Sequence, residues 1–293
     1  MLDIRGVTKQ YGDRRVLDDV TFTVGSGRLT GFVGGNGAGK TTTMRILLGV
    51  LQADSGTVSI DGARVGPADR RRFGYMPEER GLYPKMPVAE QVSYFARLHG
   101  IDKRTARTRT TDLLDRLGLA QHAGDAVEKL SLGNQQRVQV AAALVHDPEV
   151  LVLDEPFSGL DPMAVDVVLG VLRDAAAGGA PVLFSSHQLD VVERLCDDVV
   201  VIADGTIRAA GPQEELRRSA GPAAWELLVD GDVAWLRDEA GVHVREFDGG
   251  YALFEADEAT AQRVLQRAVQ HGTVGSFSPR VPRLSEVFRE VVR

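Results

Sequence analysis

The chain has 293 residues, 43% of them hydrophobic and 26% charged, so it can bury a sizeable core and is not expected to be disordered. The formal net charge of -7 disfavours nucleic acid as a partner, and the one cysteine, Cys196, excludes an internal disulfide and fits the reducing cytoplasm. No apolar run approaches the roughly 18 residues that cross a bilayer, and the N-terminus lacks the apolar stretch of a signal peptide, so we expect any membrane role to come through a partner.

Residues 1–215 alternate short apolar strands with helices, the pattern of an α/β fold whose sheet is covered on both faces. Apolar runs without polar alternation predict strands buried on both faces at residues 28–33, 150–153 and 182–184. Helices are predicted at residues 39–49, 88–99, 105–117 and 162–177. The second and third of these helices are expected to form a helical subdomain. An Asp-Gly turn predicts a hairpin of residues 199–202 and 206–209.

Composition changes after Gly211-Pro212, and we expect a small accessory domain over residues 216–293. Strands are predicted at residues 225–229, 242–246, 251–255 and 274–277, with a short helix after the first strand and longer helices at 258–271 and 283–292. A β-α-β-β-α-β order with an extra terminal helix predicts a small α+β domain.

The apolar residues of the two longer helices in this domain each fit one helical face. The faces consist of Val264, Leu265 and Val269, and of Leu284, Val287, Phe288 and Val291. Both faces are compatible with the domain's own core, and that of the terminal helix also with an interface to another chain. No phosphate loop, metal-spaced His/Cys cluster or nucleophile constellation occurs here, so we expect a regulatory or dimer-interface role.

The residues after the first buried strand match the phosphate-binding pattern G-x-x-x-x-G-K-[ST] and open a helix, as that motif requires. Glycines allow consecutive backbone N–H groups to curl around phosphates, and the helix N-terminus adds partial positive charge. Lys40 is expected to contact the β- and γ-phosphates and Thr41 to offer its hydroxyl to Mg²⁺. The predicted nucleotide contacts of this segment are Gly34, Gly35, Asn36, Gly37, Ala38, Gly39, Lys40, Thr41 and Thr42.

Two acidic residues and a histidine follow buried strands, at the carboxyl ends where open α/β sheets bind ligands. Asp154 ends the strand at residues 150–153 and is expected to hold Mg²⁺, mostly through water. Glu155, one residue further, points elsewhere and is expected to polarise the attacking water as general base. His187 follows the strand at 182–184 and is expected to bond the γ-phosphate and that water. Glu155, His187 and Lys40 are therefore the predicted catalytic residues.

A specific family resemblance comes from Leu130-Ser-Leu-Gly-Asn-Gln-Gln-Arg137, which resembles the signature sequence of ATP-binding-cassette (ABC) proteins. Ser158-Gly-Leu-Asp161 resembles the D-loop of the same family. These motifs, the phosphate loop, the acidic strand and His187 occur in the family's order across residues 1–215. The resemblance implies a P-loop ABC cassette with a RecA-like core sheet, an antiparallel β subdomain and a helical signature subdomain.

The resemblance also implies the partners of the site. Tyr11 looks like the aromatic residue that stacks on adenine. Two cassettes are expected to face each other head to tail, so that Ser131 and Gly133 of one copy contact the γ-phosphate bound by the other. This homodimer is expected to form with ATP, to open after hydrolysis, and to move a separate transmembrane permease.

Two positions depart from the family pattern. The signature reads L-S-L-G-N rather than L-S-G-G-Q, which keeps Ser131 and Gly133 and leaves the effect of Leu132 open. Glu78 stands where the family usually has a glutamine that senses Mg²⁺ and the transport partner. A carboxylate there can ligate Mg²⁺ directly or through water, and the alternative is that Glu78 is a solvated loop residue.

The segment 78–84, Glu-Glu-Arg-Gly-Leu-Tyr-Pro, and the small C-terminal domain resemble ATPase subunits of sodium-extruding and of drug- or antibiotic-exporting bacterial transporters. We therefore expect an ATPase that powers export, located in the cytoplasm and peripheral to the membrane through its permease. The alternatives are a soluble ABC ATPase and a nucleotide-gated regulatory module that no longer hydrolyses ATP. About ninety residues between Thr41 and Ser131, without heptads, disfavour the coiled-coil DNA-repair type, and a single cassette disfavours the translation-factor type.

Overall fold

A computed structural model describes residues 1–79, 81–219 and 222–292. Arg80, in the export-like segment 78–84, and Arg293, at the end of the expected accessory domain, lie outside the described residues. The chain divides into two compact units, residues 1–213 and residues 214–291. Among the described residues, no helix has the length and apolar character needed to cross a bilayer.

A six-stranded sheet in the order β10-β9-β3-β8-β7-β6 forms the centre of the first unit. Its strands are β3 (Leu29–Val33), β6 (Phe73–Met76), β7 (Val150–Leu153), β8 (Val182–Ser186), β9 (Asp198–Ala203) and β10 (Thr206–Pro212). All neighbouring pairs are parallel except the β9–β10 hairpin. Every residue of β3, β7 and β8 is buried, as their uninterrupted apolar runs predict. The parallel pairing brings the carboxyl ends of these strands to one edge.

A second sheet, antiparallel and in the order β2-β1-β4-β5, packs over the same core. Its strands are β1 (Leu2–Tyr11), β2 (Arg14–Val24), β4 (Ser55–Ile60) and β5 (Ala63–Arg64). Side chains from this sheet, from β3 and from α1 (Lys40–Leu47) share one apolar cluster, including Leu2, Val20, Phe32 and Met44. The cluster fixes α1, and with it the preceding loop, between the two sheets.

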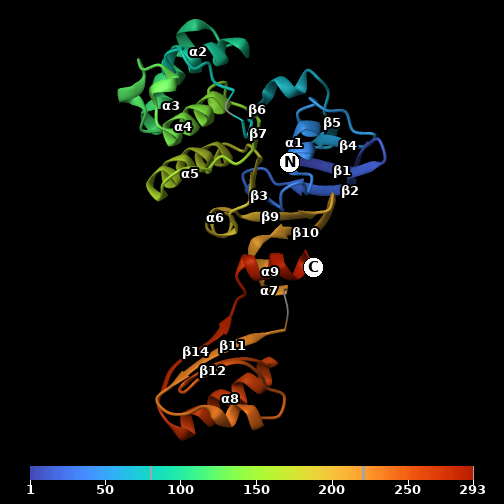
Figure 1. Cartoon of the computed structure of the whole chain (residues 1–293), viewed down its shortest axis with the longest axis vertical. Helices are drawn as coiled ribbons and strands as arrows, with labels where there is room; N and C mark the ends of the chain where they lie inside the picture. Colours follow the sequence, from blue (N-terminus) through green and yellow to red (C-terminus); the bar gives the residue numbers. More distant parts are fainter. Residues whose placement is uncertain (80, 220–221, 293) are drawn as a thin grey trace. The chain divides into compact units, whose positions relative to one another are not determined.

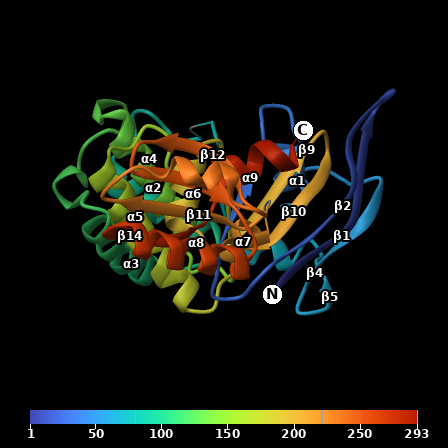
Figure 2. The ribbon, with the colours of Figure 1, turned by 90° about the horizontal axis from the view of Figure 1, so that it is seen from below.

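Helices α2 (Val88–Leu98), α3 (Lys103–Arg116) and α4 (Leu132–Leu144) gather at one end of this unit, and the antiparallel sheet lies at the other (Figure 1 and Figure 2). Asp102, Ser131 and Asp161 cap α3, α4 and α5 (Pro162–Ala177) by accepting backbone N–H bonds of the first turn. The remaining elements are η1 (Asp69–Arg72), η2 (Ala120–His122), η3 (Val127–Lys129) and α6 (Leu189–Leu195). The expected core sheet, antiparallel subdomain and helical subdomain are confirmed.

The second unit is a four-stranded antiparallel sheet in the order β12-β13-β11-β14, with α8 packed on one face (Figure 1). Its elements are α7 (Gln213–Ser219), β11 (Ala224–Val229), η4 (Ala234–Asp238), β12 (His243–Asp248), β13 (Tyr251–Glu255), α8 (Glu258–His271), β14 (Val274–Arg280) and α9 (Leu284–Val291). This order confirms the predicted small α+β topology.

Aromatic residues support the small core of the second unit. Trp225 of β11 stacks on Phe277 with ring centroids 5.1 Å apart, and Trp235 of η4 stacks on His271 at 5.9 Å. One prediction for α8 is wrong: Val269 is 62% exposed and does not share the buried face of Val264. The buried residues of α8 are Thr260, Ala261, Val264 and Ala268, a narrower stripe that excludes position 269.

Candidate nucleotide-binding and catalytic site

The predicted phosphate loop connects β3 to α1 and is held by its first and last glycines. A Cβ atom at Gly34 would lie 2.4 Å from the Ile202 carbonyl oxygen, and one at Gly39, where φ is 110°, 2.5 Å from Leu17 Cδ2. The middle of the loop, Gly35 to Gly37, is exposed, and a Cβ at either of these glycines would meet nothing within 4 Å. Packing thus requires the outer glycines, while the inner part is open to a ligand.

Lys40 is the first residue of α1, and its ammonium lies over this loop. Its Nζ atom donates to the carbonyl oxygens of Gly34 at 2.6 Å and of Gly35 at 3.2 Å. Thr41 and Thr42, the next residues of α1, are half-buried, and Ala38 is buried. A cation, a helix N-terminus and an open glycine-rich turn together make a site suited to phosphate groups.

Thr41, Asp154 and Ser185 form a chain of hydrogen bonds between α1, β7 and β8. The Thr41 hydroxyl donates to Asp154 Oδ2 at 3.1 Å, and the Ser185 hydroxyl donates to Asp154 Oδ1 at 2.5 Å. Asp154 is 2% exposed. A hydroxyl and a carboxylate are hard oxygen donors of the kind that Mg²⁺ prefers. This donor set fits the metal predicted at Thr41 and Asp154.

Glu155 sits in an unusual backbone conformation at the end of the same strand. Its φ is +53°, in the left-handed region that costs a non-glycine residue about 1–3 kcal/mol. Ser185 accepts the Glu155 N–H at 2.9 Å, and Gln136 Nε2 donates to the Glu155 carbonyl oxygen at 2.9 Å. Side chains from β8 and α4 therefore stabilise a turn that directs Glu155 away from Asp154.

The Glu155 carboxylate pairs with His187. The His187 Nδ1 atom lies 2.9 Å from Glu155 Oε1, and the side chains are 56% and 12% exposed respectively. Burial raises the pKa of Glu155 above its ordinary value, while the hydrogen bond from His187 and the charges of His187 and Lys40 oppose the shift. His187 and Lys40 therefore both interact electrostatically with the Glu155 carboxylate. A carboxylate of raised basicity beside phosphate-binding groups is suited to accept a proton from water.

The predicted signature residues lie at the start of α4. Ser131 caps this helix, its hydroxyl accepting the Asn134 N–H at 3.3 Å. A Cβ at Gly133 would lie 3.5 Å from the Gly159 carbonyl oxygen, so signature and D-loop-like segments are neighbours. In the described part of the chain, the contacts of Ser131 and Gly133 do not reach the phosphate loop. Ser131 is exposed and Gly133 is half-buried, so both are accessible to another chain.

Tyr11 and Glu78 are both exposed. Tyr11, at the end of β1, is 51% exposed, with Lys9 Nζ 5.4 Å from its ring centroid. Glu78 follows β6, and the Asp154 N–H donates to the Met76 carbonyl oxygen at 2.8 Å, so the Glu78 loop begins at the edge that carries Asp154. Among the described residues, no contact joins Glu78 to Thr41 or Asp154.

Three site residues were not predicted from the sequence. Ser185 links Asp154 to Glu155, Gln136 supports the Glu155 turn, and Gln139 Nε2 lies 3.3 Å from the Pro77 carbonyl oxygen and 3.5 Å from that of Glu79. Ser185 lies two residues before the predicted His187, and both glutamines belong to α4, the helix that begins in the signature-like segment. For Ser185 and Gln139 the available signal was a polar residue beside apolar ones, which requires a hydrogen-bond partner when buried. Gln136 stands among other polar residues, so the sequence offers no such signal for it.

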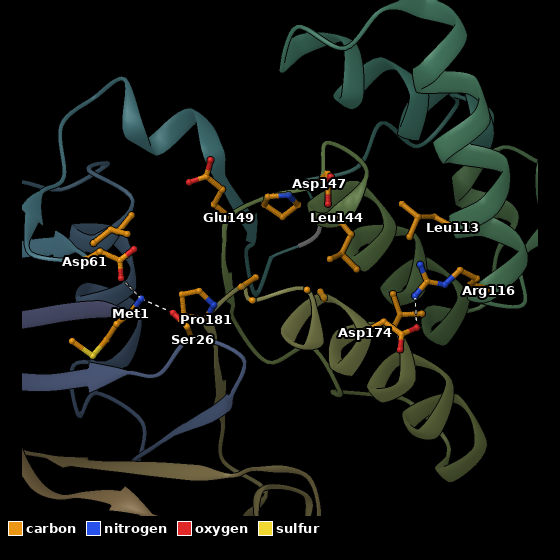
Figure 3. Close-up of a pocket in the computed structure, with 17 residues that line it drawn as sticks. Met1, Ser26, Asp61, Leu113, Arg116, Leu144, Asp147, Glu149, Asp174 and Pro181 are labelled. Atoms are coloured by element: carbon orange, nitrogen blue, oxygen red, sulfur yellow. Dashed lines mark hydrogen bonds and ion pairs between the residues drawn. The ribbon is translucent and has the colours of Figure 1, made fainter.

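A cavity of about 560 Å³ elsewhere in the first unit contains none of the predicted site residues (Figure 3). Asp61, Asp147, Glu149 and Asp174 line it, with Arg116 bonded to Asp174 at 2.7 Å and the Met1 amino group bonded to Asp61 at 2.7 Å (Figure 3). Its excess of carboxylates disfavours the phosphates of a nucleotide. The phosphate loop is therefore the better candidate site.

Comparison with protein families gives two matches along the chain. Residues 17–158 match the family described as ABC transporter. Residues 211–292 match the C-terminal domain of ATP-binding proteins similar to DrrA1-3. The first range contains the phosphate loop, the signature-like segment, Asp154 and Glu155, and the second contains the small α+β unit.

Individual proteins match over longer ranges. An uncharacterized ABC transporter ATP-binding protein YhaQ of Bacillus subtilis (strain 168) is 37% identical over 293 residues, covering 100% of this chain and 98% of that protein. The Nod factor export ATP-binding protein I of Ralstonia nicotianae is 40% identical, covering 74% of this chain and 68% of that protein. A solved structure of an ATP-binding subunit of an ABC transporter superposes with a TM-score of 0.69 and 33% identity, covering 74% of this chain and 92% of that one.

Proposed function

Because the chain belongs to the ABC transporter ATP-binding proteins, with a DrrA1-3-like C-terminal domain, we propose that it hydrolyses ATP to power export through a separate membrane subunit. The observation that carries this proposal is the convergence of Lys40, Thr41, Asp154 and Glu155 at the carboxyl ends of the parallel strands of one sheet. Under this proposal, residues 1–215 are the ATP-binding cassette and residues 216–293 an accessory domain.

The proposed reaction transfers the γ-phosphoryl group of ATP to water. The Glu155 carboxylate takes a proton from the attacking water as the new bond to phosphorus forms and the bond to the ADP oxygen breaks. His187 holds Glu155 through its hydrogen bond of 2.9 Å. Lys40 and the loop N–H groups stabilise the negative charge on the phosphates. ADP and phosphate are the products.

Mg²⁺ is the metal proposed for this site. When bound to the phosphates it would neutralise their negative charge. Thr41 and Asp154 would hold it, since their oxygens already lie 3.1 Å apart. Glu78, exposed in the loop after β6, is proposed as a further ligand, directly or through water. Tyr11 is proposed to stack on the adenine ring, for which its exposed face is available.

A second copy of the chain is proposed to complete the site through Ser131 and Gly133. Two exposed apolar side chains support this: Leu132 is 61% exposed beside Ser131, and Met163 is 81% exposed just after the D-loop-like segment. Large apolar side chains exposed beside the proposed contact residues favour an interface there. The N-terminus of α4 would add favourable partial charge toward the phosphate bound by the other copy.

The membrane subunit is proposed to contact a groove of about 420 Å³ beside the Glu78 loop. The groove is lined by Leu48, Val50, Phe73, Tyr75, Leu82 and Phe95, among others, and Val50 is 74% exposed at it. Gly81 and Leu82 of the same loop also line it, so an occupant would touch the segment that carries Glu78. Attachment here would place this chain at the cytoplasmic face of the membrane. Export is proposed from the Nod factor export relative.

The deciding experiment is ATP hydrolysis by the purified chain and by Glu155→Gln. The substitution keeps the shape of the side chain and removes the base, so steady-state hydrolysis should fall at least about a hundredfold while ATP binding persists. ATP binding by the Glu155→Gln chain must be measured as well, because it separates loss of chemistry from loss of folding. Hydrolysis of the variant within about threefold of the native rate would refute Glu155 as the base.

A further inference from the structure

Helix α4, which begins in the signature-like segment, carries a buried glutamine that is hydrogen-bonded to the candidate catalytic site. Gln136 is 4% exposed, and its amide leaves α4 toward β7 rather than toward solvent. Its Nε2 atom donates to the Glu155 carbonyl oxygen at 2.9 Å. A buried amide is normally kept only where it is hydrogen-bonded, so this bond gives position 136 a reason to be polar.

The backbone that Gln136 contacts is in a strained conformation that needs support from its surroundings. Glu155 has a φ of +53°, and its N–H and carbonyl oxygen are both engaged by side chains, from Ser185 and from Gln136. The carbonyl oxygen also accepts the Ser158 N–H at 3.1 Å. Two side chains on different elements thus set the orientation of the peptide that carries the carboxylate. One of these elements, α4, begins at Ser131.

We propose that Gln136 is a positioning residue for Glu155. Through Gln136, contact between Ser131 and the nucleotide bound by the second copy affects the orientation of the base. Gln136 lies five residues after Ser131 on the same rigid helix, so a displacement of the helix start moves both. The inference rests on the proposed function, because it requires Glu155 to act on water. Helix α4 would then have two roles: its N-terminus faces the phosphate bound by the second copy, and its Gln136 orients Glu155.

The test is Gln136→Met, which keeps the length and volume of the side chain and removes the donor. We expect kcat to fall about tenfold or more with ATP affinity unchanged, because a base misplaced by a fraction of an ångström loses efficiency while the phosphate contacts persist. The readout is the split between kcat, which falls, and ATP affinity, which stays at the native value.

The matched control is Gln91→Met in α2. Gln91 is also fully buried and bonds backbone atoms, those of Tyr83 at 2.8 and 3.1 Å, but it has no contact with Glu155. This variant should keep kcat within about threefold of the native value. Gln136→Asn is the second variant, whose amide is one methylene too short to reach Glu155, in case Gln136→Met melts well below the native chain.

The outcomes separate the inference from the proposed function. A native kcat in both Gln136 variants would overturn the positioning role, as would an equal loss of kcat in Gln91→Met. In contrast, a native chain without ATPase activity, or a fully active Glu155→Gln, would overturn the proposed function itself. Slow hydrolysis with unchanged ATP affinity and a normal Gln91→Met control would establish the role.

Discussion

At the scale of single residues, Glu155 combines burial, a left-handed backbone and a histidine partner. Its raised pKa means that the carboxylate becomes available as a base only above the pH at which an ordinary glutamate ionises. ATPase activity should therefore rise with pH through this elevated pKa. In His187→Ala the acid limb should lie at still higher pH, because the hydrogen bond that lowers the Glu155 pKa is gone. A pH–rate profile of each protein, scaled to its own maximum, measures the shift, and a limb that moves to lower pH would contradict it.

His146 gives a second prediction at this scale. Burial, followed by the charge of His99, lowers the His146 pKa from 6.5 to about 4, with Asp147 raising and Arg109 lowering it by smaller amounts. The folded chain thus favours the neutral ring. The stability that this ring contributes is fully present above pH 6.5 and is lost as pH falls toward 4.

In His146→Gln, the difference between melting temperatures at pH 7.5 and pH 5, two values that bracket the ordinary pKa of histidine, should shrink. The glutamine amide can replace the Nε2 contact to the Phe73 carbonyl oxygen, 3.1 Å in the native chain, without titrating. His122→Gln is a suitable control, since the His122 ring pairs with Asp125 instead. If the difference between the two melting temperatures shrank equally in both variants, His146 would not be the cause of the pH dependence.

At the scale of elements, the antiparallel sheet depends on a close backbone crossing at Gly56. Its φ is +91°, and a Cβ there would lie 2.4 Å from the Gly6 carbonyl oxygen. Gly62, in the turn between β4 and β5, has a similar φ of +81° but open space around it. Gly62→Ala should cost about 1–2 kcal/mol for the backbone conformation alone. Gly56→Ala should cost about 3 kcal/mol or more, since a backbone clash is added. Chemical denaturation measures both, and equal losses would exclude the clash.

The elements that could be predicted from the sequence are those specified by local pattern. Continuous apolar runs predict β3, β7 and β8, and the fixed spacing of the phosphate loop places Lys40 and Thr41. In contrast, β1 has register shifts between Ile4 and Val7 and between Val7 and Lys9, which break the alternation that marks a strand. The bond from Ser185 to Asp154 joins residues 31 positions apart, so no local pattern reveals it. Val269 was misplaced because periodicity does not give the width of a buried face.

At the scale of the whole molecule, every candidate nucleotide contact belongs to residues 1–213. A chain of residues 1–215 should therefore fold and bind ATP with native affinity, measured by titration calorimetry. A cut after Gly211 should lower the melting temperature, because it removes Gln213. That residue is 6% exposed, and its backbone N–H and side-chain amide donate to the carbonyl oxygens of Asp197 and Glu193. Lost ATP binding in a folded 1–215 chain would show that residues 216–293 contribute to the site.

The two tryptophans of the chain, Trp225 and Trp235, both lie in the second unit. Indole emission is consequently a local probe: it senses the stacking of Trp225 on Phe277 and is silent about the phosphate loop. Urea unfolding followed by this emission tracks residues 214–291, whereas far-ultraviolet dichroism tracks both units. In the native chain, a change of emission on adding ATP would report communication from the cassette to the accessory unit, without any label.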